Sequence, residues 1–289
     1  MADEFNNSLI DIGKLSKPAD TLIKKIAKGV GGISAPWQIK RVAKAEAEAA
    51  IVKAGADVEI QELQRRAVHR FFEEEARHQQ NMEEITAKAI PLLLEASDAE
   101  QVEDDWISNF FDKSRLVSDD DMQALWSRIL AGEVNNPGAF SRRTVNLLAD
   151  FDRTDADLFR GLCGFAWMIG DLQPLIFDLD NAMYVEQGID FSAITHLESI
   201  GLVRFEPLAG FQRQGLPKQF TIHYYGNPTV LTMPNDETNQ LDVGKVLLSR
   251  AGRELAPISG CTKVKGFVEF VRDHWKQFET KDVSSELSV

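Results

Sequence analysis

Apolar residues follow helical spacing in the first part of the chain. In residues 15–33 they recur in steps of three and four, and lysines occupy the other side. Ser16 is a suitable N-cap, and Pro18 fits the first turn because its missing N–H costs nothing there. The "GVGG" run at residues 29–32 weakens the helix, since an interior glycine costs about 1 kcal/mol relative to alanine. We therefore predict a short amphipathic helix that ends near these glycines.

The next segment, residues 38–89, predicts a much longer helix. It is rich in Ala, Glu, Gln, Lys and Arg, contains no proline, and is followed by Pro91. Its apolar positions are spread along the segment, and Gly55 marks a potential break. A solvated single helix of this length would be marginal, so we expect it to pack against another copy or another helix in a coiled-coil-like manner.

Residues 92–153 are acid-rich and predict a central helical bundle. "EDDWISNFFDKSRLV" indicates one helix, and "SDDDMQALWSRILAGE" indicates a second. In the second, Ser118 is the expected N-cap, Asp121 completes a capping box, and Gly132 is the expected stop. A further helix follows "PGAF", and another begins at Thr154, its expected cap.

The last third of the chain has a different pattern. "FSAITHLESIGLVRFEP" indicates a helix, a glycine and a strand, and "KQFTIHYYGNPTVLTMP" indicates two strands around a Gly-Asn-Pro turn. A strand then leads into a helix that begins near Ser249. This order is typical of a winged-helix-like unit. The predicted fold is therefore mainly α: long N-terminal helices, a central helical bundle and a C-terminal winged-helix-like α+β unit. The expected parts are residues 1–37, 38–91, 92–153, 154–260 and 261–289.

The charge is distributed unevenly. The 289-residue chain has a formal net charge of -13, yet residues 12–44 carry eight basic residues against Asp20 alone. An acidic protein repels nucleic acid unless its basic residues cluster. The predicted recognition helix, "SAITHLES", has no Lys or Arg, which argues against DNA as a partner. No segment has the pattern of a signal peptide or a spanning helix, so we expect a cytoplasmic protein.

The sequence contains no catalytic motif that we identify, and we predict no cofactor. Cys163 and Cys261 lack metal-type spacing, and we expect reduced thiols, with Cys163 in a helix core. Glu75 and His78 form an E-x-x-H pair, the spacing of helical di-metal sites. His196, His223 and His274 do not complete a second such pair. A solvated, charged helix face explains Glu75 and His78 without a metal.

The basic N-terminal helix is the main candidate for a contact with a membrane or a partner. Leu22 and Ile26 lie on its apolar face, and Trp37 is a potential boundary aromatic. Its basic candidates are Lys24, Lys25 and Lys28, and the expected hinge consists of Gly29, Gly31 and Gly32. Two interpretations stay open: the helix packs on the acidic body, or it is released from that body toward an anionic membrane.

Several motifs together resemble a known family. They are "KPADTLIKKI", "QIKRVAKAEAEA", "ELQRRA", "DDWISNFFDKSRLVSDDDMQALWSRILAGE", "PGAFSRRTVNLL" and "HLESIGL". They resemble the uncharacterised bacterial family catalogued as domain of unknown function 2806. This resemblance implies a bacterial, cytoplasmic protein and supplies no established activity. The helical core is also similar to alpha-type abortive infection proteins.

These observations predict a non-enzymatic effector or interaction protein that acts by helix-mediated association. We expect a homo-oligomer formed through the N-terminal helices. The resemblance adds a role in abortive-infection phage defence. The basic amphipathic segment adds a membrane-directed mode of action, with the protein peripheral at the inner membrane. One alternative is a winged-helix-like regulator that binds protein or nucleic acid. Another is a metal-dependent enzyme that uses Glu75 and His78.

Overall fold

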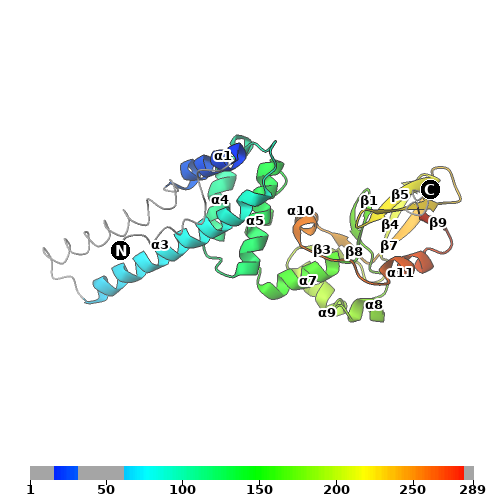
Figure 1. The fold of residues 1–289 in the computed structure, drawn as a ribbon. Helices are drawn as coiled ribbons and strands as arrows, with labels where there is room; N and C mark the ends of the chain where they lie inside the picture. The colour runs from blue at the N-terminus through cyan, green and yellow to red at the C-terminus, as the bar shows by residue number, and fades with distance from the viewer. Residues whose placement is uncertain (1–15, 32–61, 283–289) are drawn as a thin grey trace, which may run out of the picture. The chain divides into compact units, whose positions relative to one another are not determined.

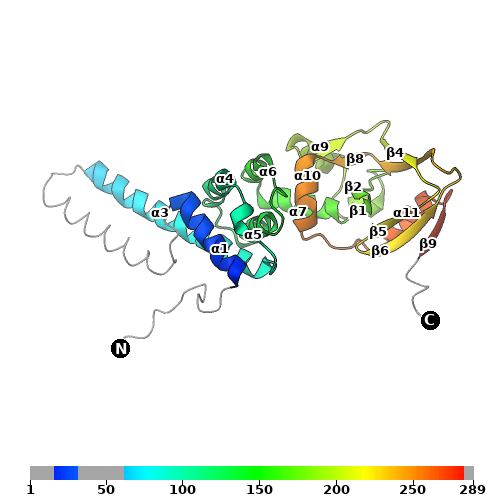
Figure 2. The same cartoon turned by 90° about the horizontal axis from the view of Figure 1, so that it is seen from above.

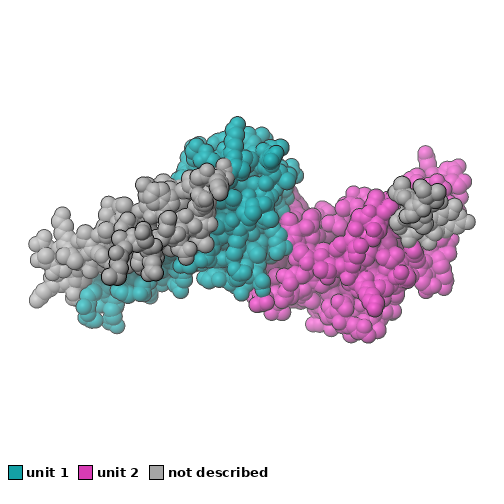
Figure 3. Space-filling view, in the orientation of Figure 1, with its two compact units in different colours: residues 1–149 teal, residues 150–289 magenta. Residues whose placement is uncertain are grey.

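The computed structural model describes residues 16–31 and 62–282, which belong to two compact units. Unit 1 is Met1–Ala149 and unit 2 is Asp150–Val289, each in its own colour in Figure 3. The predicted contact residue Trp37, the predicted hinge residue Gly32 and the first part of the predicted long helix lie outside the described residues. The five-part division expected from the sequence stays a prediction.

The described residues of unit 1 are helical (Figure 1). Its elements are α1 (Lys17–Ile26), the π-helical turn η2 (Ala27–Gly31), α3 (Glu62–Ala89), η3 (Ile90–Leu92), η4 (Ala99–Gln101), α4 (Asp104–Ser114), α5 (Asp120–Asn135) and α6 (Arg142–Leu148). The Ser16 hydroxyl caps α1 by accepting from the Ala19 N–H, as predicted. Stacked and edge-on contacts between Trp106, Phe110 and Trp126 join α4 to α5 in the core.

Helix α3 is divided into two halves by its burial. Met82, Ile85 and Ala89 are buried, and this half packs on α5. The first half, residues 62–78, extends beyond α4 and α5 in both ribbon views (Figures 1 and 2). The helix gives way to η3 at Pro91, where proline fits the start of a new turn. The two halves therefore have the same helical backbone but different surroundings.

Three predicted helix signals, two in the bundle and one at the start of unit 2, are wrong. Helix α5 is capped by Asp119, which accepts from the Met122 N–H, while the Ser118 hydroxyl is bonded to Asn81 instead. Gly132 lies inside α5, which continues to Asn135, and glycine fits there because a Cβ would come within 2.7 Å of the Phe140 ring. Helix α7 (Arg153–Cys163) starts with a capping box of Asp152 and Asp155, so its cap lies two residues before the expected Thr154.

Unit 2 combines short helices with antiparallel strands. It contains α7, β1 (Ala166–Ile169), β2 (Asp171–Pro174), α8 (Ala182–Val185), α9 (Phe191–Ser199), β3 (Val203–Phe205), β4 (Phe211–Leu216), β5 (Gln219–Tyr224), β6 (Asn227–Thr232), β7 (Asn239–Gly244), β8 (Val246–Leu248), α10 (Arg250–Leu255), η5 (Ala256–Ile258), α11 (Phe267–His274) and β9 (Glu279–Asp282). One sheet has the order β2-β1-β5-β6-β9, and two smaller sheets pair β3 with β8 and β4 with β7.

The prediction of a mainly α protein is wrong, because the C-terminal half is built around these antiparallel sheets. Strands of three to six residues give weak periodicity, and several lie in segments that also suit a helix or loop. β1, for example, lies at the end of the segment that was predicted to continue the helix beginning at Thr154. The structure is a mixed α and β fold, and the order of α9, β3, β8 and α10 is compatible with a winged-helix-like unit.

The β5–β6 hairpin also turns earlier than the sequence suggested. Tyr225 and Gly226 form the turn, with φ angles of 49° and 80°, and Pro228 lies within β6. Positive φ at both central residues is the geometry of a type I′ hairpin, which matches the twist of the strands. The stacked rings of Trp167 and Tyr224 then anchor β5 against β1 in the core.

Candidate interaction surfaces

Helix α1 is docked on unit 1 through its apolar face. Leu22 and Ile26 are fully buried, and α1 packs against η4 and α4. The two apolar candidates of the sequence analysis therefore lie in the core of unit 1. Fully burying a Leu or Ile side chain contributes about 1.5–3 kcal/mol, so this face holds α1 in place.

Ion pairs reinforce the docking of α1. The Lys25 ammonium lies 2.7 Å from one carboxylate oxygen of Asp104 and donates to the Glu100 carbonyl at 3.2 Å. The Lys28 ammonium lies 3.3 Å from the other Asp104 oxygen. Hydrogen bonds from Lys25 and Lys28 hold the pKa of Asp104 below its usual range, because both favour the charged carboxylate. Lys24 instead pairs with Asp20 on the solvent side, at 2.7 Å.

The glycines after α1 meet α4 closely. A Cβ at Gly29 would come within 3.0 Å of the Ile107 side chain, and the Ser108 hydroxyl donates to the Gly29 carbonyl at 3.0 Å. Gly29 thus permits the close approach of η2 to α4, and Gly31 is the last residue of η2. The hinge role expected for these glycines stays a prediction.

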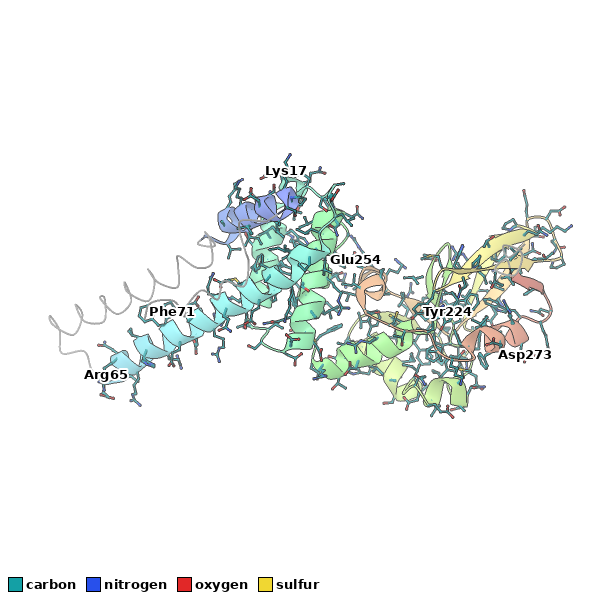
Figure 4. All side chains as sticks on the ribbon, viewed as in Figure 1. Lys17, Arg65, Phe71, Tyr224, Glu254 and Asp273 are labelled. Carbon is teal, nitrogen blue, oxygen red and sulfur yellow. The ribbon has the colours of Figure 1, made fainter. Side chains whose placement is uncertain are left out.

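A second surface lies on the first half of α3, and it was not among the sequence candidates. Val68, Phe71 and Phe72 are 43%, 58% and 36% exposed, and they share one side of the helix. We call these three residues the exposed α3 face. Leu63, which is 68% exposed, lies nearby on another side of the helix. Phe71 and Arg65 are labelled on this half of the helix in Figure 4.

Charged residues flank the exposed α3 face at both ends. Arg65 pairs with Glu62 at 2.7 Å, and Glu75 pairs with His78 at 3.3 Å. Because all but His78 of these side chains are largely exposed, the pairs contribute little stability and exchange readily for other partners. The sequence alone did not reveal this arrangement, since it could not show where the body of unit 1 ends along α3.

The candidate metal pair of the sequence analysis is this same Glu75–His78 contact. It offers two ligands, whereas a structural zinc site uses four and a catalytic site three protein ligands. Among residues 16–31 and 62–282, no group of three or more His, Cys, Asp or Glu side chains is arranged to hold a metal ion. The pair therefore has the geometry of a surface contact between neighbouring helical turns.

In unit 2, the predicted recognition helix corresponds to α9. Its His196 ring nitrogen lies 2.6 Å from Asp155 of α7, and Phe191 is exposed at its first turn. Two basic residues that follow α9 in the sequence, Arg213 and Lys218, are paired with Asp171 and Asp236, respectively. The charges of these two residues are thus partly neutralised, and a contact with DNA stays untested.

The cysteines have the environment expected of structural residues. Cys163 is buried at the end of α7, and this burial raises the pKa of its thiol far above the usual range. The thiolate is the nucleophilic form of cysteine, so the environment of Cys163 opposes reactivity. Cys261 is partly exposed, and neither cysteine is in a disulfide.

The described residues define a protein of mixed α and β class, with a docked basic helix and an open helix face as its candidate sites. The chain belongs to the family described as "Protein of unknown function (DUF2806)", which matches residues 65–272. This confirms the family predicted from the sequence motifs. No curated protein and no solved structure matches the chain. The similarity to abortive infection proteins is not shown by these comparisons. Within the described ranges, no helix combines the length and apolar character needed to cross a membrane.

Proposed function

We propose that this protein acts by binding another macromolecule through its helices rather than by catalysing a reaction. The observation that carries the proposal is the exposed α3 face, with two phenylalanines and a valine open to water on one side of a helix. Covering apolar surface is favourable by about 25 cal/mol per Å². Binding of a partner that covers this face would therefore be favoured by the removal of its apolar surface from water.

The length of the uncovered helix supports the same proposal. Residues 62–78 make up about five turns, close to the length at which an isolated helix is marginal in water. Most helical stability in proteins comes from packing of an apolar side. A partner on the exposed α3 face would supply such packing to this half of the helix.

The proposal is tested by comparing a substitution on the face with one in the buried half. Phe71→Ser should change the free energy of unfolding by no more than about 0.5 kcal/mol in dilute protein, as expected of a surface position. Ile85→Ala, on the same helix but buried, should cost about 2–5 kcal/mol. If Phe71→Ser costs as much unfolding free energy as Ile85→Ala at every protein concentration, the chain covers its own exposed α3 face, and the proposal fails.

A second candidate function is binding of α1 to an anionic membrane. It is favoured by the arrangement of α1, whose apolar side is separate from Lys24 and Lys28, both 71% exposed. Membrane binding through the apolar side requires release from the body, because Leu22 and Ile26 are buried there. The membrane must therefore favour the released state by more than the docking energy.

Flotation with liposomes tests this second function. Asp104→Asn removes the carboxylate charge that pairs with Lys25 and Lys28, and it should increase flotation on anionic lipid but not on neutral lipid. Asp105→Asn is the matched control, because Asp105 is 86% exposed and its ion pair within the described residues is a 3.9 Å contact with Arg142. If neither wild type nor Asp104→Asn floats on anionic lipid, α1 is a docked structural helix.

The other functions predicted from the sequence stay predictions, each with the support described there. A role in phage defence rests on the resemblance to abortive infection proteins, and a place at the inner membrane rests on the charge of the N-terminal segment. The regulator alternative draws support from the winged-helix-like order of elements in unit 2. The metal-dependent alternative rests on Glu75 and His78.

A further inference from the structure

The exposed α3 face continues a surface that already packs helices together. From Ala89, alternate steps of four and three toward the N-terminus reach a single stripe: Ile85, Met82, His78, Glu75, Phe71 and Val68. Its C-terminal members are buried in unit 1, and its N-terminal members are exposed. Helix-packing residues thus extend past the body, with the spacing that antiparallel and parallel helix pairs both use.

The charges at the ends of the face are arranged symmetrically. Arg65 lies three residues before Val68, and Glu75 lies three residues after Phe72. The midpoint of both pairs is residue 70. If a second α3 helix lies antiparallel across this point, Arg65 of each helix is opposite Glu75 of the other. Val68 of each helix is then opposite Phe72, so apolar residues fill the centre.

This pattern is self-complementary under a two-fold axis, which is the requirement of a symmetric dimer interface. A parallel pair would instead place arginine opposite arginine and glutamate opposite glutamate. From this arrangement we infer that the partner of the exposed α3 face is a second copy of this chain. The two copies pair antiparallel along the first half of α3, with Val68, Phe71 and Phe72 at the centre.

The inference rests on the proposed function and identifies the partner. The apolar centre is small, with three large side chains from each copy, so the dimer is reversible and depends on concentration. The ion pairs that Arg65 and Glu75 form within their own helix do not oppose the dimer. Glu62 and His78 each hold their charged neighbour in an exposed contact, and such contacts contribute at most about 1 kcal/mol.

Charge reversal in the full chain tests the pairing. Arg65→Glu places glutamate opposite Glu75, and Glu75→Arg places arginine opposite Arg65. Each variant alone should weaken self-association at least about tenfold, because like charges meet at both ends of the interface. An equal mixture of the two variants should recover dimers close to wild-type affinity, since each variant then faces its opposite charge. Sedimentation velocity over a range of concentrations gives these affinities.

Two controls separate the interface from general effects. Arg66→Glu makes the same charge change one residue away, but Arg66 is about 200° around the helix from Val68, so dimerisation should be unchanged. Phe71→Ser should weaken the dimer at least about tenfold, as expected when a buried aromatic anchor is lost. Circular dichroism confirms that each variant remains folded.

The outcomes distinguish this inference from the proposed function. If the chain stays monomeric at all concentrations and Phe71→Ser does not change its stability, the inference that the partner is a second copy is overturned. The face is then free for another partner. A monomer that loses stability in Phe71→Ser at all concentrations shows that residues of the same chain, such as 32–61, cover the face, and both proposals fail. A dimer that the mixture of variants does not restore uses another surface and overturns the inference.

Discussion

The docking of α1 makes a quantitative prediction for Ile26→Ala. Ile26 is fully buried, and the substitution removes three carbon atoms from the contact with the body of unit 1. The lost transfer energy is about 0.8 kcal/mol per buried methylene, or roughly 2.4 kcal/mol, before any residual cavity. Because α1 lies at the start of the described chain and can shift, we expect a cost of about 2–3 kcal/mol, in the lower part of the range for such substitutions.

Urea denaturation followed by far-ultraviolet circular dichroism measures this cost, with unit 1 fitted as its own transition. Lys24→Ala is the control from the same helix, because Lys24 is exposed and pairs only with Asp20 among the contacts described. It should change the free energy of unfolding by less than about 0.5 kcal/mol. If Ile26→Ala costs no more than Lys24→Ala, α1 is not held on unit 1, and the account of its docking is refuted.

Three further predictions follow from single contacts. Asp104→Asn should destabilise unit 1 at neutral pH, and the difference from wild type should begin to shrink as pH falls below about 4. The sign follows from the lowered pKa of Asp104: its contribution is complete above the ordinary aspartate pKa of about 3.9 and is lost as the folded-state carboxylate becomes protonated. Glu133→Ala should cost at least about 2 kcal/mol in urea denaturation, because the buried carboxylate accepts from two backbone N–H groups at 2.7 and 2.8 Å. A cost below about 0.5 kcal/mol would contradict this role. Gly252→Ala should lower the melting temperature of unit 2, since its Cβ would clash with the Leu202 carbonyl oxygen, and an unchanged temperature would show that α10 is not held that closely.

The amphipathic pattern of α1 predicted the helix but not its environment. The spacing of Leu22 and Ile26 and the Ser16 cap are local features, so the helix and its start could be predicted from the sequence. Amphipathicity shows which side is buried without showing against what. The pairing of Lys25 with Asp104 joins residues far apart in the chain, and no local pattern contains it.

For the first half of α3, the sequence predicted the helix but not the exposure of its side chains. Its helical character was evident from composition, yet the exposure of Phe71 and Phe72 depends on where the body of unit 1 ends. In unit 2, the sheet depends on pairing of short strands, such as β1 with β5, across more than fifty residues. Short strands carry little periodic signal, and their pairing is set by tertiary packing, so the β content was underestimated.

Hydrogen exchange along α3 tests the central claim, association through the exposed α3 face, most directly. The amides of residues 62–78 should exchange quickly in dilute protein and slow as concentration rises, because a bound copy stabilises this half of the helix. The amides of residues 81–89 should be protected at every concentration, since Met82, Ile85 and Ala89 are buried within unit 1. Strong protection of residues 62–78 that does not depend on concentration would contradict the account, because the face would then be covered within a single chain.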